Sequence, residues 1–405
     1  MQWKNKGHEF DRVGELLSSI KNVYLYGIGG NAEEILYVIE HARKWIEWNI
    51  YLVDRNPALQ ESGYREMPVM SPEQFFTVNK KEYIVVTCPL GKTGDEIFDL
   101  VCANGCPRDL VFSGWDFLYT YFSVYFLYAH DMVFFTSENI LPSSACNLNC
   151  RDCLNFNPYI VKPIVYGIDE VKKDVDIFFT AVDLIYRFQV TGGEPLLYPH
   201  LKALIQYIDQ KYRHKIMRLE MVTNGTIVPS DDTCSFLAET GVFVFLDDYT
   251  MSLPEEKKNL HAVVEDKFKK FGVNYINNFV SQWFRLYPAK VNPKVIKEES
   301  LTNLFERCAN PWSTIEHGKI SACNYSLYAQ KAGVIEGTDY DFYDLSAFEA
   351  DKKKELVEFR LRYNEKGYAS LCKKCGGFST INSNWCEPAI QAARQVGYSE
   401  VEEGT

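Results

Sequence analysis

Three cysteines within eight residues constrain this chain more than any other feature of its sequence. Cys146, Cys150 and Cys153 form a C-x3-C-x2-C run shortly after an apolar segment, residues 133–136, that predicts a strand. We expect their side chains to converge, because thiolates at this spacing can coordinate one metal centre. A structural zinc ion takes four ligands, whereas a [4Fe-4S] cluster held by three cysteines leaves one iron open for a small molecule. The spacing alone leaves both interpretations open.

Two glycine-containing strand ends follow the cysteine run. The predicted strand at residues 187–191 continues into a Gly-Gly-Glu-Pro segment, and the strand at residues 217–223 continues into Asn224 and Gly225. Glycines let a ligand approach the backbone closely, and the carboxylate of Glu194 can accept hydrogen bonds from an ammonium group. A tight turn would explain Gly-Gly-Glu-Pro equally well. The combination with the cysteine run is therefore the informative observation.

Together, these motifs resemble those of the radical S-adenosylmethionine (SAM) superfamily, over about residues 131–292. The resemblance implies a partial (β/α)6 barrel in which the three cysteines hold a [4Fe-4S] cluster whose open iron binds the amino and carboxylate groups of SAM. The positions that the resemblance assigns to SAM are Gly192, Gly193, Glu194, Pro195, Asn224 and Asp247.

Two positions depart from the pattern of the superfamily. Relatives often carry Ser-x-Asp at the end of the strand predicted at residues 242–246, whereas this chain has Phe245 before Asp247. Relatives usually have an aromatic residue directly before the third cysteine, where this chain has Asp152. The adenine contact is therefore expected from the backbone or from another side chain.

Four more cysteines form a second pattern near the C-terminus. Cys308 and Cys323 flank Gly318 in a C-x9-G-x4-C arrangement, and Cys372 and Cys375 add a C-x2-C pair. We expect Gly318 to lie at a hairpin that brings these cysteines together. The pattern resembles the twitch subdomain, a shortened relative of the SPASM domain, which implies one auxiliary [4Fe-4S] cluster. A structural zinc ribbon is the alternative.

The other cysteines are expected to be small, buried apolar side chains. They are Cys88, Cys102, Cys106, Cys234 and Cys386. Cys386 has two further interpretations, a substitute ligand of the auxiliary site or a reactive thiol, because it follows that site closely. Since Ile381 and Trp385 stand where a full SPASM domain would continue with cysteines, a single auxiliary cluster is expected. His317 is expected to be a hydrogen-bonded turn residue.

The N-terminal region carries a different motif. A strand at residues 23–26 leads into a Gly27-x-Gly29 turn and a helix, and the next strand ends at Asp54. This order matches the dinucleotide fingerprint, with a phosphate at the helix N-terminus and a ribose on the carboxylate. Residues 23–68 also resemble Rossmann-like domains of sugar-modifying acyltransferases and of methyltransferase C-terminal regions in polysaccharide pathways. A nucleotide or nucleotide-sugar, NAD(P), and a ligand-free scaffold all remain open.

The length of 405 residues predicts two or three domains, and alternating strands and helices predict an α/β fold with parallel sheets. We expect a Rossmann-like domain over residues 1–116 and a radical SAM core over residues 117–300. A cysteine-rich auxiliary-cluster module would cover residues 301–405. The core would begin with an aromatic helix at residues 117–129, which is too short to cross a membrane.

The net charge and the sequence of the first fifteen residues restrict the expected binding partners and the expected cellular location. The net charge of -11, without clustered cations, argues against nucleic acid. The polar first fifteen residues lack the apolar segment of a signal peptide, so a cytoplasmic location is expected. In that reducing compartment, closely spaced cysteines are more often metal ligands or reactive thiols than disulfides.

The resemblance also implies a reaction. SAM would be cleaved reductively to a 5′-deoxyadenosyl radical that abstracts a hydrogen atom, with a flavodoxin- or ferredoxin-type electron donor and an auxiliary cluster in electron transfer. The N-terminal domain favours a small-molecule substrate, namely a sugar, an aminocyclitol or a nucleotide-linked sugar. The alternatives are a radical SAM peptide maturase and a non-catalytic nucleotide-binding protein with structural metal sites. No residue is singled out as the catalytic acid or base.

Overall fold

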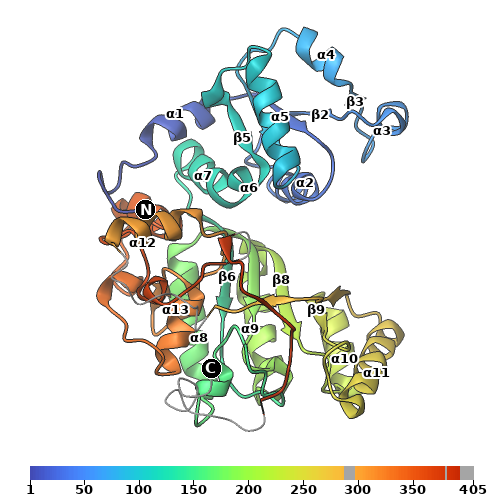
Figure 1. Ribbon diagram of the computed structural model, residues 1–405, viewed down its shortest axis with the longest axis vertical. Coiled ribbons are helices and arrows are strands. Elements are labelled where there is room, and N and C mark those ends of the chain that lie inside the picture. Colours follow the sequence, from blue (N-terminus) through green and yellow to red (C-terminus); the bar gives the residue numbers. More distant parts are fainter. Residues whose placement is uncertain (287–296, 379–380, 393–405) are drawn as a thin grey trace. The chain divides into compact units, whose positions relative to one another are not determined.

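The computed structural model describes residues 1–286, 297–378 and 381–392. It divides into two compact units, one formed by Phe10–Thr136 and the other by Met1–Glu9 together with Ser137–Thr405 (Figure 1). The domain boundaries expected at residues 116/117 and 300/301 remain predictions. The end of the predicted SAM-binding region, residues 287–292, and the last thirteen residues of the predicted C-terminal module lie outside the described residues.

The first unit contains a five-stranded parallel sheet in the order β3-β2-β1-β4-β5. Its strands read as nearly continuous apolar runs because a parallel sheet is buried on both faces. The strands are β1 Asn22–Tyr26, β2 Asn49–Val53, β3 Val69–Met70, β4 Tyr83–Thr87 and β5 Val111–Ser113. The helices are α1 Asp11–Ser19, α2 Asn31–His41, α3 Pro57–Ser62, α4 Pro72–Thr77, α5 Lys92–Ala103 and α6 Gly114–Asp116.

The predicted aromatic helix is present in this unit, as a π-helical turn, Phe117–Tyr121, that continues into α7, Phe122–His130. Most of its side chains are buried, which explains why nearly every position in it is apolar or aromatic. Among the described residues, no helix combines the length and the apolar character needed to cross a membrane.

The second unit contains a five-stranded sheet in the order β10-β9-β8-β7-β6. Each strand from β6 to β9 is followed by a helix before the next strand, so sequential strands become neighbours, as in an open barrel (Figure 1). The strands are β6 Phe134–Ile140, β7 Leu184–Val190, β8 Ile216–Thr223, β9 Phe243–Asp248 and β10 Tyr275–Phe279. The helices are α8 Ile168–Ala181, α9 Leu201–Tyr212, α10 Asp231–Thr240 and α11 Glu255–Phe271. The expected α/β class with parallel sheets is confirmed.

One predicted boundary in this unit is wrong. The pattern of residues 169–186 predicts one long helix, but α8 ends at Ala181 and β7 begins at Leu184. Val182 leaves the helix in an extended conformation, with φ -107° and ψ 124°. The buried apolar residues of the following strand had continued the apolar spacing of the helix, which is why periodicity alone did not separate them.

Short elements complete the C-terminal part. They are β11 Trp283–Phe284, α12 Glu298–Arg307, β12 Ile315–Glu316, β13 Lys319–Ser321, α13 Asn324–Lys331, β14 Phe342–Asp344, α14 Lys353–Arg360 and β15 Trp385–Cys386. The predicted hairpin is confirmed, since β12 and β13 pair in antiparallel fashion around His317 and Gly318, with φ of 50° and 72°. Both turn residues donate backbone hydrogen bonds to Asp174 of α8, at 2.9 and 2.7 Å. His317 is therefore a hydrogen-bonded turn residue, as expected.

A buried ion-pair cluster joins β7 and β8. The carboxylate of Glu220, which is fully buried, accepts two hydrogen bonds from Arg187 at 2.7 and 3.0 Å and one from Arg218 at 2.6 Å. Gln189 donates to the same carboxylate at 3.2 Å. The cluster therefore fixes neighbouring side chains of two central strands.

We expect Glu220→Ala to lower the free energy of unfolding by about 3–5 kcal/mol, because it removes the buried carboxylate that both guanidinium groups contact. Chemical denaturation of the purified protein measures this change. Glu239→Ala, at an exposed position of α10, serves as the matched control and should stay within about 0.5 kcal/mol of the wild type. Equal effects of the two substitutions would contradict the structural role of Glu220.

Candidate active site and a second cysteine cavity

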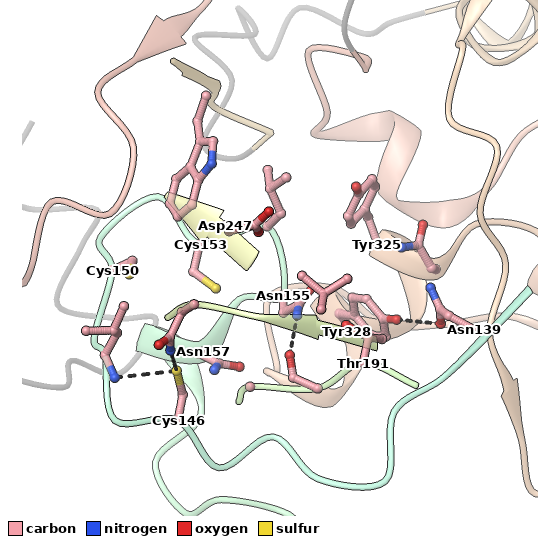
Figure 2. A pocket seen from close by; sticks show the side chains of 18 of the residues that line it. Asn139, Cys146, Cys150, Cys153, Asn155, Asn157, Thr191, Asp247, Tyr325 and Tyr328 are labelled. Carbon is pink, nitrogen blue, oxygen red and sulfur yellow. Dashed lines mark hydrogen bonds between the residues drawn. The ribbon is translucent and has the colours of Figure 1, made fainter. Parts of the chain in front are cut away.

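The three cysteines of the first motif lie in the loop between β6 and α8 and line one cavity of about 210 Å³. The same cavity is lined by Gly192 and Gly193 after β7, by Asn224 after β8 and by Asp247 of β9. Figure 2 shows the cysteines on one side of the cavity and Tyr325, Tyr328 and Asn139 on the other. The structure thus brings together three motifs that lie about forty and about thirty residues apart in the sequence.

The two glycines are required by the close approach of the cysteine loop itself. Gly193 donates a backbone hydrogen bond to Ser143 at 2.9 Å, and Glu194 donates one to Ala145 at 2.8 Å. A Cβ atom on Gly192 would lie 2.5 Å from the Ser143 oxygen, and one on Gly193 would lie 2.4 Å from the Ala145 oxygen. The sequence pattern predicts that a ligand approaches these glycines, and the structure adds the close approach of the cysteine loop as a second constraint.

The carboxylate of Glu194 accepts its hydrogen bonds from other groups of the protein. It accepts hydrogen bonds from the Asn224 backbone at 2.8 Å, from the Thr223 hydroxyl at 2.9 Å and from the Leu196 backbone at 3.1 Å. Burial raises the pKa of Glu194 to about 7. These contacts fix the end of β8 against the end of β7, so Glu194 positions the wall of the cavity. Pro195 begins the short helical turn Pro195–Leu197 beside it.

Asn224 connects this strand end with the cysteine loop. Its amide donates to the side-chain oxygen of Asn147 at 3.0 Å and to the sulfur of Cys146 at 3.7 Å. Its own oxygen accepts hydrogen bonds from the backbone and hydroxyl of Thr226, at 2.9 and 2.6 Å. The Thr-Asn-Gly motif therefore directs a hydrogen-bond donor towards one of the proposed ligands.

Asp247 is the carboxylate among the residues that line the cavity. It accepts hydrogen bonds from the Tyr249 hydroxyl and from the Asn278 amide, both at 2.7 Å. Burial raises the pKa of Asp247 to about 6. Tyr249 packs edge-on against Trp283, at 5.3 Å between ring centroids, and both rings line the cavity. Neither ring belongs to a recognisable sequence motif.

Asp152, which replaces the expected aromatic residue, forms ion pairs. Its carboxylate accepts hydrogen bonds from Arg285 at 2.7 and 3.3 Å and lies 3.2 Å from the guanidinium of Arg151. Burial, together with the nearby Asp152 carboxylate, raises the pKa of the Cys386 thiol to about 11. Cys386 therefore neighbours the first cysteine loop, which the sequence did not indicate.

The second set of cysteines lines a separate cavity. Cys308, Cys323, Cys372 and Cys375 all border it. Burial raises the pKa of Cys323 to about 11 and raises those of Cys372 and Cys375 as well. Asn310 donates to the sulfur of Cys323 at 3.5 Å, and the Gly377 backbone donates to that of Cys375 at 3.2 Å. Tyr325 borders both cysteine cavities, so they share a wall.

Across residues 1–286, 297–378 and 381–392, no group of three or more His, Cys, Asp or Glu side chains has the arrangement that holds a single metal ion. The cysteines of each set nevertheless border one cavity.

The dinucleotide-like motif lies in the other unit. Asp54 accepts hydrogen bonds from the backbone of Ile28 at 2.7 Å and of Asn56 at 2.8 Å, so its carboxylate braces the glycine turn. A Cβ atom on Gly27 would lie 2.5 Å from Pro89, whereas one on Gly29 would meet open space. The nucleotide or NAD(P) ligand of this motif stays a prediction.

Comparison with known proteins identifies the central region. Residues 140–265 match the family model described as the radical SAM superfamily. The chain carries a radical SAM domain. This domain contains the cysteine loop and both glycine-containing strand ends. Proteins of this superfamily use SAM and a [4Fe-4S] cluster.

Curated relatives match a short part of the chain. GTP 3′,8-cyclase 1 of Mycobacterium tuberculosis is 29% identical over 87 residues, which are 20% of this chain and 24% of that protein. GTP 3′,8-cyclase 3 of Mycobacterium bovis is 34% identical over 88 residues, which are 20% of this chain and 22% of that protein. The matches thus span at most about a quarter of these relatives.

Solved structures match over a larger part. A structure described as BtrN in complex with AdoMet and 2-DOIA has a TM-score of 0.39 and 16% identity, covering 65% of this chain and 98% of that chain. A structure of anSMEcpe with bound AdoMet and a Cp18Cys peptide has a TM-score of 0.39 and 17% identity, covering 66% and 94%.

The donor set of the radical SAM domain suits a three-cysteine cluster. Burial raises the pKa of all three thiols, so their ionisation needs a nearby cation such as iron. Hydrogen-bond donors already point at the sulfurs: the Leu148 backbone lies 3.4 Å from that of Cys146, and the Gln391 amide 3.4 Å from that of Cys150. Such donors stabilise cluster thiolates.

We expect Gly193→Ala to lose about four irons per chain, because its Cβ would displace the carbonyls that position the cysteine loop. Iron analysis after anaerobic purification measures the loss. Gly167→Ala is the matched control, since its Cβ would meet open space at an ordinary φ of -65°. Full iron content in Gly193→Ala would contradict this account of the loop.

Proposed function

We propose that this chain is a radical SAM enzyme that abstracts a hydrogen atom from a small hydroxyl-rich molecule, namely a sugar, an aminocyclitol or a nucleotide-linked sugar. When bound, the cluster and SAM supply a 5′-deoxyadenosyl radical for that abstraction. The observation that carries the proposal is the convergence of three cysteines and three strand ends on one cavity.

The chemistry of the cavity wall supports a hydroxyl-rich substrate. Carboxamide side chains, each of which both donates and accepts hydrogen bonds, occur repeatedly in the wall. They belong to Asn139, Asn155, Asn157, Gln189, Asn224 and Asn324. Aromatic rings from Tyr249, Trp283, Trp312, Tyr325 and Tyr328 provide apolar faces between them. Such mixed walls orient a polar ligand while excluding water.

Charge in the same wall favours some of these substrates over others. The described residues that line the cavity include the carboxylate of Asp247 and no lysine or arginine. A phosphate-bearing ligand is usually met by cations. A neutral sugar, or an aminocyclitol whose ammonium group faces Asp247, therefore suits this wall better than a nucleotide-linked sugar.

The residues of the chain have distinct roles in this proposal. Cys146, Cys150 and Cys153 hold the cluster, and Glu194 holds the strand ends in place. Asp247 accepts a hydrogen bond from a hydroxyl or ammonium group of the bound molecule. The second set of cysteines would hold an auxiliary cluster, which would supply a second redox centre, and Tyr325 borders both sites. A flavodoxin- or ferredoxin-type protein supplies the initial electron.

The proposal is tested by SAM cleavage. We expect the anaerobically reconstituted, reduced protein to form 5′-deoxyadenosine, and Cys150→Ala to form none. Cys375→Ala is the paired variant, because it alters the second cavity and should retain cleavage. Absence of 5′-deoxyadenosine from fully clustered wild-type protein would overturn the proposal. Deuterium transfer into 5′-deoxyadenosine from a panel of labelled sugars, aminocyclitols and peptides then identifies the substrate class.

We expect Asp247→Asn to keep its iron but to need about tenfold more SAM or substrate for half-maximal cleavage, because the substitution removes one charged hydrogen bond. Tyr249 and Asn278 face this carboxylate, and its pKa of about 6 makes it charged above that pH. Wild-type cleavage should therefore weaken as the pH falls through 6, and the variant should lose this dependence. Asp248→Asn, the neighbouring control, should behave as the wild type.

A further inference from the structure

The segment at residues 387–392 pairs with the first cysteine loop, although about 240 residues separate them in sequence. Arg151 donates a backbone hydrogen bond to Ile390 at 2.8 Å, and Ala392 donates one to Asn149 at 2.7 Å. Cys150 and Gln391 face each other as an antiparallel bridge. The cysteine loop is thus hydrogen-bonded to a segment that lies outside the radical SAM domain.

The side chain of Gln391 completes this contact. Its oxygen accepts a hydrogen bond from the Asn149 backbone at 2.8 Å, while its nitrogen donates to the Cys150 sulfur at 3.4 Å and to the Ala389 carbonyl at 2.6 Å. The opposite orientation of the amide would place its oxygen against the Ala389 carbonyl and its nitrogen against a backbone N–H. The surrounding groups therefore fix the donor towards Cys150.

The same segment contributes packing around the cysteine. Ala389 is fully buried in an apolar cluster with Leu148, Cys150, Tyr249 and Leu253. Cys150 itself is only 7% exposed. This segment therefore limits the access of solvent to one of the three proposed ligands.

Lys257 of α11 holds another part of the loop. Its ammonium group donates to the backbone oxygen of Asn147 at 2.9 Å. The loop is thus hydrogen-bonded to α11 through Asn147 and to the C-terminal segment through Asn149 and Arg151. Only Gln391 offers both a donor to a cysteine sulfur and an acceptor for the loop backbone among these contacts.

We infer that Gln391 is a positioning residue for the cluster on Cys146, Cys150 and Cys153, and that residues 389–392 shield this cluster. The inference rests on the proposed function, because it requires a cluster at these cysteines. A hydrogen bond to a cluster sulfur favours the reduced, more negative state and so raises the reduction potential. Groups that hydrogen-bond to the metal-ligating side chains also slow the loss of the metal.

The experiment compares Gln391→Ala, Gln391→Glu and Ala392→Pro with the wild type. Gln391→Ala removes the amide, Gln391→Glu replaces the donor by a negative charge at nearly the same volume, and Ala392→Pro removes the backbone donor to Asn149. Gln210→Ala, at an exposed position of α9, is the matched control. Two quantities are measured: the rate of iron loss to a chelator, and the midpoint potential of the cluster whose EPR signal changes when SAM is added.

We expect iron loss to be about tenfold faster in Gln391→Ala and in Ala392→Pro than in the wild type. The midpoint potential should shift to a lower value in Gln391→Glu. Rates and potentials equal to those of Gln210→Ala would overturn the inference while leaving the proposed function intact. A wild-type protein without a SAM-responsive EPR signal would contradict the proposed function itself, and the inference with it.

Discussion

The close approach of the strand end after β7 to the cysteine loop is the contact on which the rest of the site depends. Gly192 and Gly193 allow it, because any side chain at either position would overlap with a carbonyl of the loop. The backbone hydrogen bonds from Gly193 and Glu194 then fix where the loop begins. The three cysteines follow within ten residues, so their convergence is a consequence of this contact.

Buried polar groups extend this constraint to the rest of the cavity. Glu194 is buried at a cost in solvation, which its three hydrogen bonds offset, and it joins the ends of β7 and β8. The side-chain amide of Asn224 donates a hydrogen bond to the Cys146 sulfur, and that of Gln391, which is distant in sequence, donates one to the Cys150 sulfur. A site assembled in this way can hold the cysteine sulfurs in a fixed orientation before any cofactor is bound.

Much of this arrangement was predictable from the sequence, because the informative signals are local. The cysteine spacings, the strand-end motifs and the hairpin at Gly318 each occupy a few consecutive residues. The contacts that the sequence did not reveal join distant positions: Asp152 with Arg285, Trp283 with Tyr249, and Gln391 with Cys150. Arginine and glutamine are mostly exposed in proteins and tryptophan is mostly buried wherever it occurs, so no local pattern distinguishes these residues until the fold places them beside the cavity. The sequence does not reveal the end of α8 for a different reason, since the apolar residues of β7 continue the apolar spacing of the helix.

We propose that the two cysteine-lined cavities hold two separate iron-sulfur clusters, of which one binds SAM. The most direct measurement is iron and sulfide content of the anaerobically reconstituted protein, combined with EPR of the reduced protein before and after addition of SAM. We expect about eight irons per chain and two cluster signals, of which one changes with SAM. Zinc in place of iron, or cluster signals that are all indifferent to SAM, would contradict it.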